Sequence, residues 1–352
     1  MLKRFVSMVL LVVMTVLFLT GVAMLYGTWS AWVFDLHRIG GFALVAVLPW
    51  KGIVVYRSLR RRVKGYAPWP STIPSIPMAP LLIVVVALGL MWMWRFGPYR
   101  SVMAQTVIAW HWILGLIMIP LFLAHVVLRW PQPRMTDFAS RRGALRLLAL
   151  GAAGAAGWVL GVALARARAT EERPRRSITG SRGFGRFTGN DFPIMGEHTI
   201  GVDVEQWRLT IDGAVEEPLT LTYDDILSLS AEQMTETIDC TSGWYSVQAW
   251  SGVPLVRLLE EAGGLDGAGV RLVSATEYNH TYPMAEARTI LLATHVTGEV
   301  LTARHGYPLR AVVPDRRGWF WVKWLTRIEV LESHAEVLGG ILSAARQVLR
   351  QF

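Results

Sequence analysis

The sequence predicts an N-terminal all-α bundle of five transmembrane spans, followed by a C-terminal α+β domain. Three observations predict this division. The long apolar stretches of the 352-residue chain all lie before residue 171. Acidic residues are almost absent there, since only Asp35 and Asp137 precede that position. From about residue 178 onward, the chain instead shows short runs of alternating apolar and polar residues, which are typical of strands.

The net charge of +9 is divided unequally between the two parts. Residues before 171 include 18 Lys and Arg, and the remainder includes 17, whereas 24 of the 26 acidic residues lie in the second part. Basic residues in the loops of an apolar segment set membrane topology, and nucleic-acid binding requires a basic patch on a folded surface instead. We therefore expect no nucleic-acid partner.

Five apolar stretches are long enough to cross a bilayer, which requires about 20 residues. They cover residues 5–26, 39–56, 78–96, 102–130 and 144–165. Pro49 and Lys51 interrupt the second stretch, and the fifth is rich in Gly and Ala, which suits close helix packing in lipid. We expect residues 1–135 to form a four-span bundle and residues 136–170 to supply the fifth span.

Basic residues are concentrated in alternate loops. They precede the first stretch, follow the second, and lie between the fourth and the fifth, whereas residues 27–36 and 97–101 carry little charge. The positive-inside rule then predicts a cytoplasmic N-terminus. Five spans place the C-terminal domain on the outer, periplasmic side of a bacterial cytoplasmic membrane.

Two adjacent arginines, Arg141 and Arg142, precede the mild fifth apolar stretch. The run Ser-Arg-Arg-Gly-Ala-Leu-Arg is similar to a twin-arginine export signal, although it lies inside the chain. Such signals serve domains that fold around a cofactor before export. The alternative is that both arginines are ordinary positive anchors on the inner side. In either case we expect an uncleaved anchor.

The C-terminal domain is expected over residues 171–332. Residues 207–213 and 270–274 read as strands, and residues 223–229 and 256–262 read as short helices. Residues 333–352 are expected to form an amphipathic helix that packs against the bundle or the membrane surface. Its apolar face comprises Leu338, Leu342, Ala345, Leu349 and Phe352.

Cys240 is the only cysteine, so an intrachain disulfide is impossible. An idle thiol in an exported domain is a liability, which makes this residue a candidate for function. The segment around it, residues 237–259, resembles the molybdopterin-binding domain of the sulfite oxidase superfamily. In that family a Cys is followed by Trp-x-Gly-Val-Pro-Leu and a Leu-Leu helix. The resemblance continues in family order through residues 291–293, 298–301, 305–310, 313–314 and 322–325, and covers about residues 185–332.

The resemblance implies a fold of the sulfite oxidase type and a molybdenum cofactor. In the family the metal is held by the dithiolene of one pterin, by oxo groups and by one protein thiolate, and Cys240 matches that thiolate. Thiolate is a soft ligand that suits such a metal. The resemblance also implies that polar and basic side chains hold the pterin and its phosphate, at positions Asn190, His305, Arg310 and Lys323. The alternative for each is an ordinary turn or surface residue.

The chain departs from the family directly after the cysteine. Sulfite and nitrate enzymes of the group place arginines there, but here no Arg follows before Arg257. A small inorganic anion is therefore not the expected substrate. Trp244 and Tyr245 are expected to wall a less charged catalytic pocket, with core packing as the alternative. The chain looks like a fusion of the periplasmic protein-methionine-sulfoxide reductase with its haem-bearing membrane partner.

Three histidines, His37, His111 and His125, lie in or beside the apolar stretches. His111 and His125 are 14 residues apart. On one helix this spacing corresponds to about 21 Å along the axis, and it places both residues on nearly the same face. The expected topology places His37 opposite His111 near the outer side, so one bis-histidine haem b is predicted between them. The partner position for His125 is Lys51, so an inner haem site there is incomplete. The alternative is that these histidines bond to backbone or interfacial water.

Together these features predict a molybdenum oxidoreductase that transfers an oxygen atom to or from a small molecule or a protein side chain. A haem-bearing membrane part would exchange electrons with a quinone or a cytochrome. Two alternatives stay open. The domain is a degenerate molybdopterin fold with a binding or assembly role, or the bundle is a bare anchor for the enzyme.

Overall fold

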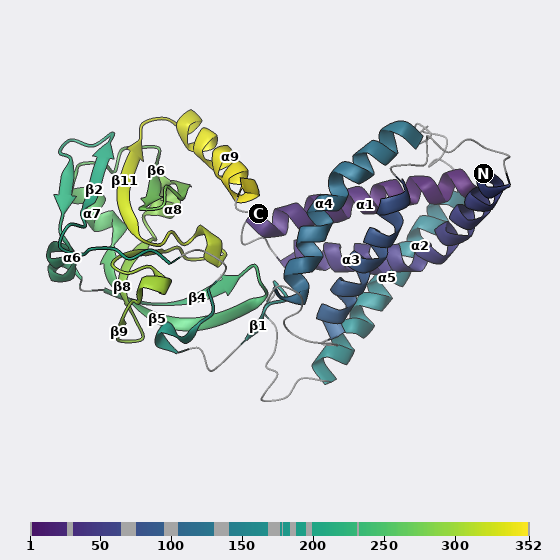
Figure 1. The fold of residues 1–352 in the computed structure, drawn as a ribbon, viewed down its shortest axis with the longest axis horizontal. Coiled ribbons are helices and arrows are strands. Elements are labelled where there is room, and N and C mark those ends of the chain that lie inside the picture. Colours follow the sequence, from purple (N-terminus) through teal and green to yellow (C-terminus); the bar gives the residue numbers. More distant parts are fainter. Residues whose placement is uncertain are drawn as a thin grey trace. The chain divides into compact units, whose positions relative to one another are not determined.

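The computed structural model describes residues 2–26, 31–64, 75–94, 105–129, 141–167, 177, 179–183, 188–194, 199–230 and 232–350. The chain divides into two compact units, Met1–Gly183 and Phe184–Phe352. Figure 1 shows long helices in the first unit, and strands together with helices in the second.

The first unit consists of long helices. They are α1 (Leu2–Tyr26), α2 (Ala31–Val63), α3 (Ser75–Trp94), α4 (Val107–Arg129) and α5 (Arg141–Ala167), and a two-residue strand, β1 (Arg182–Gly183), follows them. All five helices are long and apolar enough to cross a membrane. This confirms the five predicted apolar helices, although residues 95–104 and 130–140 at their expected ends lie outside the described residues. Helix α2 continues through Pro49 and is longer than the predicted stretch.

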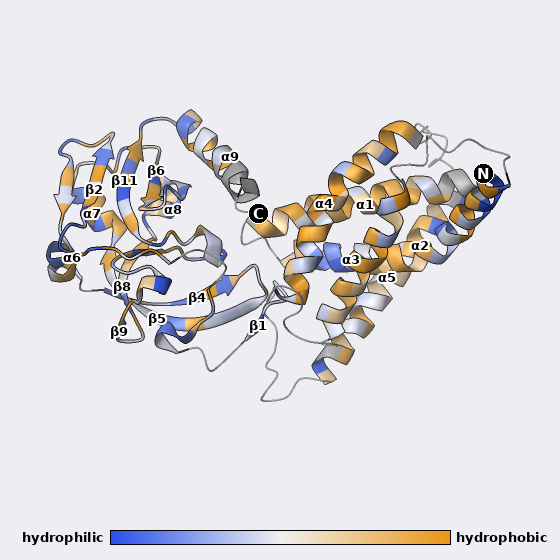
Figure 2. Ribbon diagram, viewed as in Figure 1, coloured by the Kyte–Doolittle hydropathy of each residue, from blue (hydrophilic) through white to orange (hydrophobic). Residues whose placement is uncertain are grey.

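Apolar residues predominate along these helices (Figure 2), and many of their side chains are exposed. Leu19, Ile83 and Val127 are 66%, 64% and 82% exposed. Exposed side chains of this kind suit lipid rather than water. Between the helices, a smaller apolar core is formed by Val6, Leu10, Met14, Leu44, Val85, Met118 and Phe122.

The small residues of α5 allow it to approach α2 closely. A Cβ at Gly154 would lie 2.7 Å from the carbonyl oxygen of Ile39, and a Cβ at Gly157 would lie 2.9 Å from the ring of Phe42. A larger residue at either position would push the two helices apart. The Gly and Ala content of the fifth stretch therefore has a packing reason.

The second unit is an α+β domain with two sheets, as the sequence predicts. One sheet has the order β4-β5-β8-β10, and β9 pairs with β8. The other has the order β3-β2-β11-β6-β7, in which only β2 and β11 run parallel among the pairs that the structure describes. The strands of the first sheet are β4 (Glu232–Cys240), β5 (Trp244–Pro254), β8 (Leu291–Val296), β9 (Glu299–Val300) and β10 (Arg310–Val312). Those of the second are β2 (Leu209–Gly213), β3 (Leu219–Leu221), β6 (Gly269–Ser274), β7 (Asn279–Pro283) and β11 (Leu325–Leu331).

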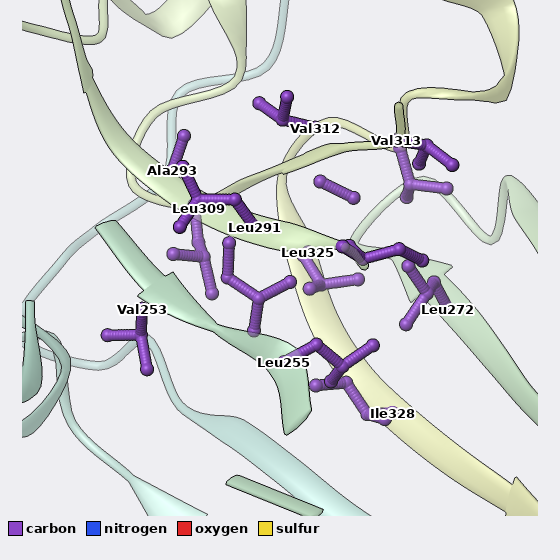
Figure 3. Close-up of a cluster of buried hydrophobic side chains, with 14 of the residues drawn as sticks. Val253, Leu255, Leu272, Leu291, Ala293, Leu309, Val312, Val313, Leu325 and Ile328 are labelled. Atoms are coloured by element: carbon purple, nitrogen blue, oxygen red, sulfur yellow. The ribbon is translucent and has the colours of Figure 1, made fainter. Parts of the chain in front are cut away.

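Short helices connect the strands of this domain. They are α6 (Tyr223–Leu229), α7 (Leu255–Glu261), α8 (Met284–Ala287) and the 3-10 turns η4 (Gly189–Asp191), η5 (Ala303–His305) and η6 (Gly318–Phe320). A cluster of buried apolar side chains from strands of both sheets, from α7 and from the segment before β10 forms the core (Figure 3). Its members include Val253, Leu255, Leu272, Leu291, Leu309, Leu325 and Ile328. This packing fixes the strand ends and turns that carry Cys240, His305 and Arg310.

Gly252 shows how tightly β5 and β8 approach. A Cβ at this position would overlap the carbonyl oxygen of Leu292, where the register between the strands shifts. We therefore expect Gly252→Ala to lower the free energy of unfolding by about 3 kcal/mol, because neither backbone can yield without breaking the pairing. Thermal unfolding of the detergent-solubilised protein measures this loss. The control is Gly339→Ala on an exposed helix surface, where a Cβ meets nothing within 4 Å; equal stability of the two variants would contradict the expectation.

The C-terminal helix α9 (His334–Arg350) forms as predicted, and it contacts the domain through the face that contains Val337 and Gly340. Leu338 and Leu342 are 59% and 60% exposed, whereas Val337 is 5% exposed. Gly340 lies against Thr281 of β7, where a side chain would clash. The contact with the domain is therefore made by Val337 and Gly340, because the close approach to Thr281 requires a glycine. The side chains of residues 344–352 lie outside the described part, and packing on the bundle or membrane stays a prediction.

The turn η6 is fastened to β7 by a buried histidine. Tyr278 donates its hydroxyl hydrogen to the carbonyl of Trp319 at 2.6 Å, so its oxygen must accept the 2.7 Å bond from Nε2 of His280. His280 is 3% exposed, and its ring lies 4.7 Å from that of Phe320. Burial lowers the pKa of His280 to about 4.

This histidine predicts a loss of stability in mild acid. In the unfolded chain His280 becomes protonated below about pH 6.5, whereas in the folded protein it stays neutral down to about pH 4. The free energy of unfolding therefore falls as the pH falls through that window. We expect His280 to lower the free energy of unfolding by about 2–3 kcal/mol at pH 4.5 relative to pH 7. Thermal unfolding of wild type and His280→Gln at pH 7 and 4.5 measures it, since glutamine does not titrate. Parallel losses in both proteins would show that His280 is not responsible.

Candidate cofactor sites

Cys240 stands at the end of a tight hairpin. It is the last residue of β4 and pairs with Trp244, the first residue of β5. Gly243 adopts a φ of +89° and donates its N–H to the carbonyl of Cys240 at 2.9 Å, which closes the turn. The thiol is half-buried, and Sγ lies 3.0 Å from Oγ of Ser242. Burial raises the pKa of this thiol, so a thiolate here needs a compensating cation or metal.

Arg317 supplies a cation beside the cysteine. Its Nη2 donates to the carbonyl of Cys240 at 2.9 Å and lies 3.5 Å from Oδ1 of Asp239. Only 7% of the side chain is exposed. Arg317 was not predicted from the sequence. The family pattern places arginines directly after the cysteine, whereas Arg317 comes 77 residues later. Its place between two of the family-like blocks, Val-Pro and Val-Lys-Trp-Leu, was the available signal.

Trp244 and Tyr245 occupy different environments. Trp244 is 3% exposed, and its ring lies 5.9 Å from that of Phe192. This is core packing, the alternative that the sequence left open. Tyr245 is half-buried opposite Asp239 on the hairpin. A role for either side chain in a catalytic pocket stays a prediction.

His305 is a buried histidine with both ring nitrogens engaged. Its Nε2 lies 2.9 Å from the carbonyl of Phe192, and its Nδ1 lies 2.7 Å from Oγ1 of Thr302. A carbonyl only accepts, so Nε2 carries the hydrogen and Nδ1 accepts from the hydroxyl. Burial lowers the pKa of His305, and the nearby cations Arg310 and Lys323 lower it further. The ring is therefore neutral at pH 7.

Arg310 and Lys323 lie on either side of the same turn. Arg310 is 4% exposed and donates Nη1 to the carbonyl of His305 at 2.9 Å. Lys323 lies with Nζ 4.4 Å from the ring centre of Trp324. Gly306, with a φ of +109°, brings them together, because a Cβ there would lie 3.1 Å from Cβ of Lys323. The turn therefore gathers positive charge, which suits an anionic group such as a phosphate.

Three aromatic rings enclose the guanidinium of Arg310. Its central carbon lies 5.6 Å from the ring centre of Phe192 and 5.7 Å from those of Trp250 and Trp321. Cations are favourable over aromatic faces, so the rings offset part of the cost of burying this charge.

Asn190 ties the turn η4 to the His305 turn. Its Nδ2 donates to the carbonyl of Val300 at 2.9 Å and to Oε2 of Glu299 at 3.2 Å. Its Oδ1 accepts from the N–H of Thr302 at 3.1 Å. These bonds give the side chain a positioning role, and direct contact with a pterin stays a prediction.

Phe192 connects the cysteine to the cationic turn. Its ring packs on Trp244, the hairpin partner of Cys240, and its carbonyl accepts from His305. The hairpin that carries the thiol and the turn that carries the cations thus both contact Phe192. This donor set fits a metal held by sulfur together with a phosphate-bearing organic cofactor.

In the first unit, the structure brings His37 of α2 and His111 of α4 together. Their ring centres are 6.2 Å apart, and their planes meet at 85°. Two imidazoles that bind one iron through Nε2, with bonds of about 2 Å, have ring centres about 6 Å apart. The spacing therefore fits bis-histidine haem ligation.

The hydrogen bonds of these rings fix suitable tautomers. Nδ1 of His111 lies 2.8 Å from the carbonyl of Val85 and must donate to it. Thr20 donates its hydroxyl hydrogen to the carbonyl of Val16 at 2.6 Å, so it accepts from Nδ1 of His37 at 2.9 Å. Both Nε2 atoms then keep a lone pair for a metal.

Two glycines leave room beside the rings. A Cβ at Gly21 would lie 3.4 Å from Cε1 of His37, and a Cβ at Gly89 would lie 3.0 Å from Cε1 of His111. His125 is half-buried on α4, and an inner haem site at that residue stays a prediction. Arg141 and Arg142 are exposed at the start of α5, and their use as an export signal also stays a prediction.

Comparisons with known proteins agree with the second unit. The family described as "Oxidoreductase molybdopterin binding domain" matches residues 196–337. The uncharacterized oxidoreductase YuiH of Bacillus subtilis is 34% identical over 146 residues, which are 39% of this chain and 73% of that protein. The protein-methionine-sulfoxide reductase catalytic subunit MsrP of Xanthomonas campestris pv. campestris is 30% identical over 189 residues, covering 48% of this chain and 58% of that protein.

Among solved structures, the sulfane dehydrogenase SoxCD from Paracoccus pantotrophus is similar at 30% identity. The match has a TM-score of 0.37 and covers 38% of this chain and 40% of that one. The matched family region contains Cys240, the His305 turn and Arg317. The chain therefore belongs to the oxidoreductase molybdopterin-binding domain family.

Proposed function

We propose that the protein is a membrane-anchored molybdenum oxidoreductase that transfers an oxygen atom on the outer side of the cytoplasmic membrane. The observation that carries this proposal is the packed group around Phe192, which joins the Cys240 hairpin to the cationic His305 turn. Cys240, Trp244 and His305 of this group lie within residues 196–337, which match the molybdopterin family, and Phe192 lies shortly before them.

The cofactor would supply the two-electron oxygen-atom chemistry, and the protein would hold and tune it. Cys240 would bind the molybdenum through its thiolate. Arg310 and Lys323 would hold the phosphate of the pterin, since both lie at the His305 turn. His305 and Asn190 would keep that turn in place.

The membrane part would carry electrons one at a time. His37 and His111 would bind a haem b, which their ring separation and tautomers support. The haem would exchange electrons with a quinone or a cytochrome. The basic loops support a cytoplasmic N-terminus and a periplasmic catalytic domain. Export with the cofactor already bound would use Arg141 and Arg142.

The proposed substrate class is sulfoxides, either free or in protein side chains. The similarity to a catalytic subunit named as a protein-methionine-sulfoxide reductase supports this class. The absence of an Arg between Cys240 and Arg257 in the sequence also distinguishes the chain from sulfite and nitrate enzymes.

Metal and haem analysis of the purified full-length protein, combined with a viologen-linked assay, tests the proposal. Molybdenum, a reduced haem spectrum and reduction of methionine sulfoxide are the expected results. A preparation without molybdenum would favour a binding or assembly role. Molybdenum with turnover but no haem would make the bundle an anchor, with electrons delivered by a soluble cytochrome.

A further inference from the structure

Arg317 is placed against the main chain of the cysteine rather than against a carboxylate. Its Nη2 lies 2.9 Å from the carbonyl oxygen of Cys240, but 3.5 Å from the nearer oxygen of Asp239. The Cys240 carbonyl also accepts the N–H of Gly243 at 2.9 Å. The guanidinium and the hairpin turn thus hold the same peptide group from two sides.

The turn that carries Arg317 is itself fixed on β4. Gly318 follows Arg317, and a Cβ there would lie 3.2 Å from Cγ1 of Ile238 and 3.6 Å from the carbonyl of Asp239. The other end of this turn is held by Tyr278 through Trp319. Arg317 therefore has little freedom to leave the cysteine.

The neighbouring Arg316, unlike Arg317, forms a complete ion pair with a carboxylate. Its Nε and Nη2 donate to the two carboxylate oxygens of Glu286 at 2.6 and 2.8 Å, a complete bidentate pair. Arg317 is 6% exposed, and its buried Nε makes no hydrogen bond with any described residue. A buried cation with a long ion pair and an unused donor is costly, and such a cost points to a functional constraint.

We propose that Arg317 is the positioning residue of the molybdenum thiolate: it fixes the Cys240 main chain and keeps a positive charge beside the metal. This inference rests on the proposed function of Cys240 as the metal ligand. Fixing the peptide orients the thiolate, as outer groups orient metal ligands elsewhere. A nearby positive charge favours the reduced metal, so it raises the reduction potential.

The test compares Arg317→Gln, Arg317→Lys and the adjacent control Arg316→Gln in the full-length protein. The readouts are molybdenum content, the Mo(V) electron paramagnetic resonance spectrum and the midpoint potential. R317Q should keep molybdenum, shift the Mo(V) spectrum and lower the one-electron equilibrium constant for reduction about tenfold, which corresponds to about 59 mV. R317K should restore the potential but not the spectrum, because it keeps the charge and loses the planar fork. R316Q should match wild type.

A wild-type spectrum and potential in R317Q would overturn the inference. If R317Q does not fold, the R317K variant provides the test. A wild-type Mo(V) spectrum in R317K would overturn the proposal that Arg317 orients the thiolate of Cys240. Wild-type protein without molybdenum would instead overturn the proposed function, and the inference with it. The metal content of wild type therefore separates the two failures.

Discussion

Cys240→Ser is expected to lower turnover at least about 1000-fold while the domain stays folded. Serine offers a hard, protonated oxygen where the metal requires a soft thiolate, and the described structure places no other thiol in the domain. The loss corresponds to about 4 kcal/mol of transition-state stabilisation. Turnover with methionine sulfoxide and reduced viologen, normalised to molybdenum content, measures it.

The control for this variant is Ser242→Ala. Ser242 contacts the thiol at 3.0 Å, so its loss perturbs the same turn but leaves the thiolate in place. S242A should retain molybdenum and turnover within about tenfold, since a single hydrogen bond is worth about 1 kcal/mol. Equal turnover of C240S and wild type would show that Cys240 is not the metal ligand.

His111→Ala is expected to remove the haem absorbance from the membrane unit. Alanine leaves His37 without its partner 6.2 Å away, and a haem with one protein ligand in an apolar bundle is held weakly. His37→Ala should have the same effect for the same reason. The reduced-minus-oxidised spectrum of the purified protein, with haem extracted and quantified, measures the loss.

The matched control is Gly115→Ala, one helical turn after His111 on α4. A Cβ at Gly115 meets nothing within 4 Å, so this variant should keep the full haem spectrum. Gly89→Leu provides a steric test, because a side chain there would contact the His111 ring. An unchanged haem band in H111A would contradict the proposed ligation.

Features set by local sequence were predictable. The five long helices follow from apolar stretches, because backbone groups in lipid must be paired within each segment. The α+β class of the second unit follows from alternating runs and turn residues. Cys240 stood out because it is the only cysteine. The closeness of His37 and His111 followed from span direction and residue counting.

Features set by tertiary packing were not predictable in the same way. Arg317 reaches Cys240 only because Tyr278, just before β7, and residues of β4 contact the turn that carries Arg317, and no local pattern encodes that contact. The helix α9 packs through Val337 and Gly340 rather than its most apolar face, since contact with Thr281 requires a glycine. Trp244 is buried in the core because its ring packs against Phe192, which is distant in the sequence.

The ligation of molybdenum by Cys240 is tested most directly by X-ray absorption at the molybdenum edge. The measurement compares purified wild type with C240S at matched metal content. The proposed ligation predicts that the metal in wild type has one sulfur neighbour more than the metal in C240S. The same sulfur count in both proteins would contradict the claim that the thiolate of Cys240 holds the metal.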